Sequence, residues 1–295
     1  RSIQKSVNAD TKIGNNQSPN EYIFVCREDL NLSSNISIRH YFDNNEMFDI
    51  IINCAAYTQV DRAEQEVELA SQINHLAVKK LASIASNQQA RLIHISTDYV
   101  FDGESNKPYL ETDTPNPINV YGKTKLAGEQ ALQTVMPMNG LIIRTSWVYS
   151  EYGNNFVSTM LKLGKEQDEL SVVIDQMGSP TYATDLAELI LTIIESKAFN
   201  QESQETEIFH YSNDGKISWY DFAIKIFKIA KIDCKVNKIK LQQYPTTAKR
   251  PKNTYLYNSK VIKNFRIKGI FWTVSLNKCM MQIQNKLNNR TVKEN

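Results

Sequence analysis

The sequence has 295 residues, of which 41% are hydrophobic and 22% charged, and its 34 Lys and Arg residues against 32 Asp and Glu residues give a net charge of +2. These proportions are those of an ordinary soluble protein. No apolar run is long enough to cross a bilayer, and the charge balance gives no electrostatic case for binding nucleic acid. The first 20 residues are polar and resemble no signal peptide, so we expect a cytoplasmic protein.

Cysteine and histidine are both rare and dispersed along the chain. Each occurs four times, without the short paired spacings that mark zinc or redox sites, which predicts reduced thiols and no metal site. His94 lies inside an apolar run, where we expect a packed core residue rather than a metal ligand. The full set is Cys26, Cys54, Cys234, Cys279, His40, His75, His94 and His210.

The first half of the chain alternates strand-like and helix-like segments. Short apolar runs rich in β-branched residues predict buried parallel strands at Tyr22–Val25, Asp49–Cys54, Arg91–Thr97 and Leu141–Val148. Apolar residues at three- and four-residue spacing predict helices at Asp61–Ile73, continuing through Leu76–Ala85, and at Lys123–Val135. Because strands that alternate with helices indicate crossover connections, we expect an α/β fold with a doubly wound, Rossmann-like parallel sheet.

The pattern weakens after Gly164. Short strands and helices are expected there at Ser171–Ile174, Thr184–Glu195, Ile208–Ser212, Ser218–Ala230 and Val236–Lys240. The length of the chain exceeds the usual size of one domain. We therefore expect a main domain over residues 1–150 and a smaller α/β part over residues 151–295, with some segments of the second part returning to the main domain.

Polar and aromatic residues gather where the predicted strands end. The second strand runs into Ala55–Thr58, the third into Ser96–Tyr99, and the fourth into Arg144–Trp147. In open parallel sheets, ligands bind outside the carboxyl ends of the strands. The three segments are therefore expected to converge on one crevice.

Tyr121 and Lys125 place a phenol and an ammonium four residues apart, on the same face of the predicted helix. A nearby positive charge favours the phenolate and lowers the pKa of the tyrosine, as a proton donor to a developing alkoxide requires. A solvated helix face is the alternative interpretation of this pair taken alone. Thr97, at a strand end 24 positions upstream, supplies a hydroxyl that is able to bond the same substrate oxygen.

Six stretches, in order, resemble the extended short-chain dehydrogenase/reductase family, and within it the dTDP-4-dehydrorhamnose reductases. The resemblance covers nearly the whole chain and implies that residues 1–150 bind a dinucleotide and residues 151–295 mainly the substrate. The stretches are Asn53–Glu64, Ser96–Gly103, Pro117–Glu129, Arg144–Tyr149, Gly178–Thr181 and Arg250–Thr254.

The resemblance implies a role for each matching position. Tyr121 would protonate a ketone oxygen, Lys125 would hold the nicotinamide ribose and tune Tyr121, and Thr97 would orient the carbonyl. Asn74 would help to fix the local backbone and solvent, although a helix cap or a helix-bending residue is an alternative for it. For Trp147, the alternative to a sugar contact is a plain aromatic residue of the core. The remaining implied positions are cofactor contacts at Ala55, Ala56, Tyr57 and Thr58 and sugar contacts at Asp98, Tyr99 and Trp147.

The resemblance implies an oxidoreductase that uses NADPH or NADH to reduce the 4-keto group of dTDP-4-dehydro-L-rhamnose, giving dTDP-L-rhamnose for surface polysaccharide. Its small-molecule partner would be a nucleotide sugar, and a homodimer is left open. Elimination of water is not expected, because Tyr99 stands where related dehydratases carry Glu. The alternative is a non-catalytic subunit resembling the regulatory subunit of methionine adenosyltransferase, which has no need of Tyr121, Lys125 and Thr97.

The sequence departs from the family pattern at its beginning. The family opens with a strand and a glycine-rich phosphate loop, neither of which is present, and Arg1–Val7 looks like the helix that follows such a loop. We therefore expect either a truncated sequence or a true variant, and the missing loop favours the non-catalytic alternative.

The residues after the first predicted strand differ as well. Cys26 and Arg27 replace the acidic residue that accepts from a ribose hydroxyl, and an Arg there suits the 2′-phosphate of NADPH. Asn31 stands where relatives usually have Asp against the adenine end, and with Leu32 completes the predicted cofactor contacts.

Overall fold

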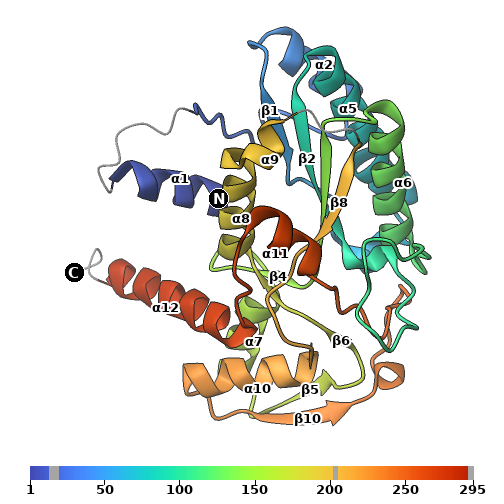
Figure 1. Ribbon diagram of the computed structural model, residues 1–295. Coiled ribbons are helices and arrows are strands. Elements are labelled where there is room, and N and C mark those ends of the chain that lie inside the picture. The colour runs from blue at the N-terminus through green and yellow to red at the C-terminus, as the bar shows by residue number, and fades with distance from the viewer. Residues whose placement is uncertain (13–19, 202–204, 292–295) are drawn as a thin grey trace.

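The computed structural model describes residues 1–12, 20–201 and 205–291. Its centre is a parallel sheet of four strands in the order β1-β2-β3-β8 (Figure 1). The strands are β1 Ile50–Asn53, β2 Arg91–Thr97, β3 Gly140–Thr145 and β8 Glu207–His210. All six residues of β3 are buried, as expected for a strand that is covered on both faces.

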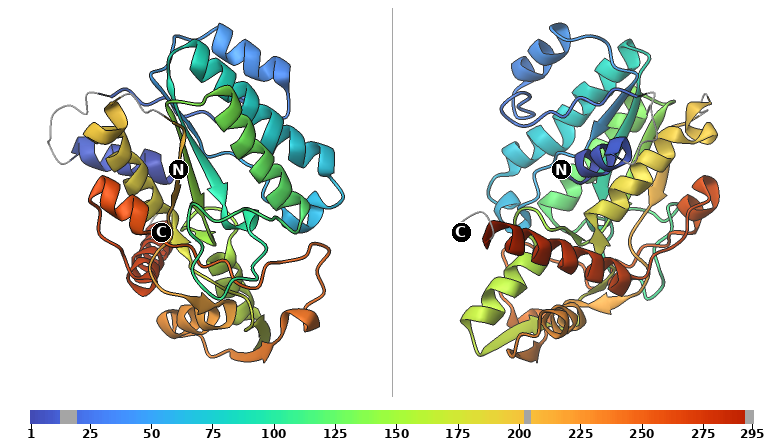
Figure 2. Two further views of the ribbon diagram at one scale, coloured as in Figure 1. Left: turned by 45° about the vertical axis from the view of Figure 1, so that its right-hand side comes forward. Right: turned by 90° about the vertical axis from the view of Figure 1, so that its left-hand side faces the viewer.

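Helices cover both faces of this sheet (Figure 2). One apolar cluster packs α2 Asn35–Asp43, α5 Ala77–Asn87 and α6 Val120–Val135 against one face. The opposite face packs against α8 Ala183–Glu195, α9 Lys197–Asn200 and α11 Ser259–Phe265, and α1 Ser2–Lys12 lies against α8. The expected α/β fold with a doubly wound parallel sheet is therefore confirmed.

The lower part of the molecule in Figure 1 has its own apolar cluster. It contains α7 Phe156–Glu166, β5 Glu169–Val173, α10 Trp219–Ala230, β10 Lys235–Ile239 and α12 Trp272–Thr291. Two short strand pairs lie outside the main sheet: β4 Val148–Tyr149 with β7 Thr181–Tyr182, and β6 Met177–Gly178 with β9 Ile217–Ser218. Because β8 returns to the main sheet, the second half of the chain contributes to both parts; the division at residue 150 stays a prediction.

One predicted strand is wrong. Residues 20–26 form no strand, and Ile23, Phe24 and Val25 are 57%, 42% and 40% exposed. A strand needs a neighbour for its backbone hydrogen bonds, and β1 pairs only with β2 among the described residues. The apolar run alone could not show that none of the described segments pairs with it.

The helix predicted from Asp61 to Ala85 is interrupted. It forms as α3 Val60–Ala63, α4 Val67–Ser71, a π-helical turn at Gln72–Leu76, and α5. Asn74 lies buried in the π-helical turn. The remaining short helices are η2 Asp98–Val100 and η3 Leu241–Gln243. None of the described helices combines the length and apolar character needed to span a membrane.

Candidate active site

Thr97 is the last residue of β2 and caps the short helix η2 that follows it. Its hydroxyl accepts a hydrogen bond from the Tyr99 amide at 3.2 Å and donates to Asp98 Oδ1 at 3.0 Å. Thr97 and Asp98 are 5% and 3% exposed. The strand end therefore holds the hydroxyl in a fixed position at the edge of the sheet.

The first turn of α6 packs closely against η2. Asn119 caps the helix by accepting from the Gly122 amide at 2.8 Å. Gly122 is required because a Cβ atom there would lie 2.1 Å from the Tyr99 carbonyl oxygen. The close approach brings Tyr121 to Tyr99, with ring centroids 5.7 Å apart in an edge-on arrangement.

Tyr121 behaves differently from the sequence-based expectation. Burial raises the pKa of Tyr121 to about 12, and a hydrogen bond with the Thr97 side chain opposes this increase. Lys125 does not contribute to the shift. The expectation that the lysine charge lowers this pKa is therefore wrong for this structure, because the ammonium is directed elsewhere.

Lys125 lies on α6 with Tyr121, as predicted, and is 1% exposed. Its Nζ atom donates to the Ile95 carbonyl at 2.7 Å and lies 3.2 Å from His94 Nε2. Burial lowers the pKa of Lys125 to about 8. His94 is fully buried, as expected for a core residue, and burial also holds its pKa well below the usual value.

Asn74 fixes the loop that follows β1. Its Oδ1 atom accepts from the Tyr57 amide at 2.9 Å, and its Nδ2 atom donates to the Tyr57 carbonyl at 3.1 Å and to Thr124 Oγ1 at 3.2 Å. The same loop leaves Ala55 and Thr58 exposed. Thus one buried amide ties the predicted cofactor loop to α6.

The residues around β1 and α6 fit the nicotinamide end of a dinucleotide. The small Ala55 and Ala56 side chains, exposed and half-buried, leave room for a flat ring against the loop. Within the described residues, we identify no glycine-rich loop for the pyrophosphate.

The other predicted cofactor residues lie before α2. Arg27 is exposed in a tight turn, in which the Asp29 carboxylate accepts from the Cys26 amide at 3.0 Å. Asn31 accepts from Ser33, and Leu32 packs into the apolar cluster beneath α2. Within the described part of the chain, these residues make no hydrogen bond to the Thr97–Tyr121 group.

Trp147 follows the end of β3 and packs between Trp219 and Gly178. It has a φ of +47°, which an aromatic residue rarely adopts, and its ring stacks on Trp219 at 3.6 Å with the planes 10° apart. Gly178 lies against the indole. Trp219 was not predicted, because its position at the start of α10 resembles an ordinary amphipathic helix.

The segment Ala248–Arg250 contacts α3 and the residue that caps α6. Arg250 pairs with Asp61 at 2.6 Å, and Asp61 also accepts from the Ala248 amide at 3.0 Å. Asn119 donates to the Lys249 carbonyl at 2.8 Å. The motif that begins at Arg250 belongs to the family pattern, but nothing in that pattern identifies Asp61 as the partner of Arg250.

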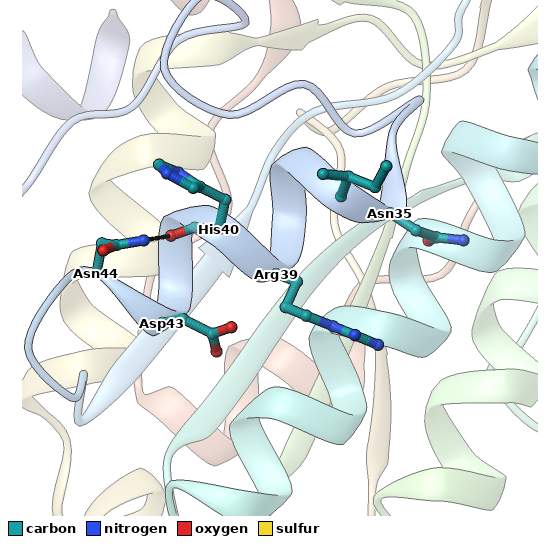
Figure 3. A pocket seen from close by; sticks show the side chains of 6 residues that line it. Asn35, Arg39, His40, Asp43 and Asn44 are labelled. Carbon is teal, nitrogen blue, oxygen red and sulfur yellow. Dashed lines mark hydrogen bonds between the residues drawn. The ribbon is translucent and has the colours of Figure 1, made fainter.

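A separate hollow lies along α2, lined by residues of that helix and its end (Figure 3). Figure 3 shows Arg39 and His40 directed to different sides of the helix. The hollow contains none of the predicted site residues, and it plays no part in the site described here. Among the described residues, no group of His, Cys, Asp or Glu has the arrangement of a metal site.

Comparison with known proteins gives a consistent result. Residues 12–285 match the family model described as the RmlD substrate binding domain. A curated dTDP-4-dehydrorhamnose reductase from Aggregatibacter actinomycetemcomitans is 45% identical over 234 residues, which cover 77% of this chain and 79% of the relative.

Solved structures of enzymes with the same name are also similar. The enzyme from Clostridium acetobutylicum has a TM-score of 0.86 at 39% identity, covering 96% of this chain and 95% of that one. The enzyme from Bacillus anthracis, solved in complex with NADP, has a TM-score of 0.83 at 36% identity, covering 92% and 94%.

Proposed function

The chain belongs to the RmlD substrate binding domain family, and we propose from this premise that it reduces the 4-keto group of dTDP-4-dehydro-L-rhamnose with NADPH, forming dTDP-L-rhamnose. The structural observation that carries the proposal is the position of Tyr121 at the start of α6, beside the turn that Thr97 caps at the end of β2, with Lys125 one helical turn further along α6. The regulatory-subunit alternative is not favoured, because the matching curated relatives are reductases.

Tyr121 and Thr97 would have separate roles in the reduction of the ketone. NADPH supplies a hydride when bound. The Tyr121 hydroxyl donates its proton to the ketone oxygen, and the Thr97 hydroxyl holds that oxygen by a hydrogen bond. The raised pKa of Tyr121 keeps the phenol protonated at neutral pH, as a proton donor requires.

We assign the remaining predicted contacts by their place in the fold. Ala55 to Thr58 would lie along the nicotinamide, with Lys125 against its ribose. Asp98, Tyr99 and Trp147 would contact the sugar. Arg27 would face the 2′-phosphate of NADPH, and the segment with Asn31 and Leu32 the adenine end. Replacing Arg27 by Asp should then shift the preference toward NADH, measured as the ratio of kcat/KM values.

We also propose that the enzyme works in the cytoplasm, as a member of a biosynthetic route, and that residues 151–295 mainly bind the nucleotide sugar. A homodimer remains an open expectation. Fractionation of cells tests the cytoplasmic location, and light scattering of the purified protein tests the homodimer.

The direct experiment supplies the purified protein with dTDP-4-dehydro-L-rhamnose and NADPH. The expected result is loss of NADPH absorbance with formation of dTDP-L-rhamnose, identified by NMR. Retention of the keto sugar under conditions where a known reductase consumes it would contradict the proposal.

A further inference from the structure

The first turn of α6 carries Tyr121, and contacts from outside the helix hold this turn in place. A helix leaves its first four amide groups without partners in the helix itself. Two of them have partners here, because the Gly122 amide donates to Asn119 Oδ1 and the Val120 amide donates to Glu64 Oε1, each at 2.8 Å. Asn119 directly precedes the helix, whereas Glu64 lies 56 residues away from Val120, at the end of α3. Glu64 is therefore an anchor from another part of the fold.

The helix α3 is itself fixed to the segment Ala248–Arg250. Asp61 of α3 accepts from a backbone amide and from the guanidinium of that segment, at 3.0 and 2.6 Å. The Lys249 carbonyl of the same segment accepts from the Asn119 side chain at 2.8 Å. With the hydrogen bond of Glu64, these contacts form a closed ring through α3, the first turn of α6 and the segment Ala248–Arg250. The first turn of α6 is thus tied to two other segments at once.

Two other acidic side chains of this stretch have different partners. Asp61 pairs with Arg250, and Glu66 accepts from the Tyr57 hydroxyl at 2.6 Å. Glu64 is half-buried, and its carboxylate accepts directly from the backbone of α6. A hydrogen bond to an ionised acceptor is about twice as strong as one between neutral groups. The contact of Glu64 with α6 is therefore a specific one within a stretch of several carboxylates.

The place of the Tyr121 phenol depends on the place of this turn. Tyr121 directly follows Val120, so its backbone moves with the anchored amide. On the other side, a Cβ atom at Gly122 would lie 2.1 Å from the Tyr99 carbonyl oxygen, so the turn already lies as close to η2 as it can. A displacement of about 1 Å from the productive geometry can slow a reaction about 100-fold. Loss of an anchor one residue away should therefore affect proton donation by Tyr121.

We propose that Glu64 is a positioning residue for Tyr121, an inference that rests on the proposed ketone reduction. Its carboxylate holds the Val120 amide, and with it the first turn of α6, where the phenol reaches the ketone oxygen. Glu64 acts through the backbone and does not need to contact the substrate or the cofactor. Two simpler roles compete with this one. The first is a helix cap that contributes only to stability, and the second is a negative charge that is favourable near a helix N-terminus.

Three substitutions at Glu64 separate these roles. Glu64→Gln keeps the length of the side chain and an acceptor oxygen but removes the charge. Glu64→Asp keeps the charge, but its shorter side chain holds the carboxylate back from the Val120 amide, and Glu64→Ala removes both. With dTDP-4-dehydro-L-rhamnose and NADPH, kcat should fall about tenfold in Glu64→Asp and Glu64→Ala and stay within about twofold of the wild type in Glu64→Gln. The KM for NADPH should be unchanged in all three variants.

Ser196→Ala is the matched control for the loss of a helix cap. Ser196 accepts from the Phe199 amide at 3.1 Å at the start of α9, which packs on the opposite face of the sheet from α6. This variant should unfold at a lower urea concentration than the wild type and keep its kcat. If Glu64→Ala also loses stability alone, Glu64 is only a cap and the proposal is overturned. A low kcat in Glu64→Gln with a normal kcat in Glu64→Asp would assign the effect to charge and would overturn it as well.

A second measurement does not require turnover. In NMR spectra of protein with ¹³C-labelled tyrosine rings, the Tyr121 signal is the one that Tyr121→Phe lacks. Because the Tyr99 ring lies edge-on to Tyr121 with centroids 5.7 Å apart, a displacement of Tyr121 changes the ring-current contribution to its chemical shift. The signal should move in Glu64→Asp and Glu64→Ala and stay in place in Glu64→Gln and Ser196→Ala.

The NMR result also separates the two proposals. An unmoved Tyr121 signal in Glu64→Ala would overturn the positioning role of Glu64, whatever the activity of the wild type. A signal that moves as expected, in a protein whose wild type does not reduce the keto sugar, would support the positioning role and count against the proposed reduction alone.

Discussion

Lys125 and His94 meet inside the protein, with Nζ 3.2 Å from Nε2. The Asn53 side chain determines which of the two ring nitrogen atoms of His94 carries the hydrogen. Its oxygen accepts from the Ala55 amide at 3.1 Å, so its nitrogen donates to His94 Nδ1, also at 3.1 Å. His94 therefore carries its hydrogen on Nε2 and directs it at the lysine amine. This arrangement favours an uncharged Lys125, in agreement with the lowered pKa of about 8.

The first prediction concerns His94→Leu. This change removes the His94 partner of the Asn53 amide nitrogen and one of the two partners of Lys125 Nζ, which keeps the Ile95 carbonyl, and an unsatisfied group costs about 1–3 kcal/mol. The free energy of unfolding, measured with urea, should fall by at least that amount. His94→Gln keeps a polar side chain and should lose less. Equal stability of the leucine variant and the wild type would show that this network contributes nothing.

A second prediction concerns the buried ion pair of Glu129 and Arg144, whose side chains are 1% and 2% exposed and 2.7 Å apart. Glu129→Leu leaves the guanidinium buried and uncompensated, which should cost about 3–5 kcal/mol. Glu129→Leu combined with Arg144→Met removes both charges and should recover much of the loss. A double variant that unfolds at a lower denaturant concentration than Glu129→Leu alone would contradict this prediction.

Arg250→Ala tests the contact between the segment Ala248–Arg250 and Asp61. Loss of the pair with Asp61 should raise the KM for the nucleotide sugar about fivefold, equivalent to about 1 kcal/mol, with a smaller change in kcat. Lys235→Ala is the control, because its pair with Glu169 has side chains that are 72% and 62% exposed. An equal effect of the two substitutions on KM would remove any special role for Arg250.

Gly178→Ala tests the proposed contact of the Trp147 ring with the sugar. The added Cβ atom would lie 2.8 Å from the Trp147 ring, so the indole must move. We expect the KM for the nucleotide sugar to rise about tenfold, since displacements of about 1 Å have effects of this order. Gly153→Asn serves as the control, because nothing lies within 4 Å of that position and asparagine tolerates its φ of +65°. Unchanged KM in Gly178→Ala would argue against contact between Trp147 and the sugar.

The sequence indicated the sheet and the placement of Tyr121 and Lys125 on one helix because those features follow local patterns. The β-branched runs around Leu92 and Ile142 form β2 and β3, and Tyr121 and Lys125 share α6 as their spacing predicts. Whether an apolar run pairs as a strand depends on a neighbour elsewhere in the fold, which is why the prediction at Tyr22–Val25 was wrong.

Contacts between distant segments could not be predicted in the same way. The Asp61–Arg250 pair spans 189 residues, and the Trp147–Trp219 stack spans 72. The direction of the Lys125 side chain also depends on His94, which reaches it from the neighbouring strand. Spacing along a helix places two residues on one face, but the partners of a charged group come from tertiary packing.

The most direct test of the whole account measures Tyr121→Phe beside the wild type, with dTDP-4-dehydro-L-rhamnose and NADPH. The phenylalanine ring keeps the packing against Tyr99 and removes only the transferable proton. We predict that kcat falls by about 10²- to 10⁴-fold, while the dissociation constant for NADPH, measured by fluorescence titration, stays within a factor of about two. Turnover close to that of the wild type would contradict the assignment of Tyr121 as the proton donor and, with it, the mechanism described here.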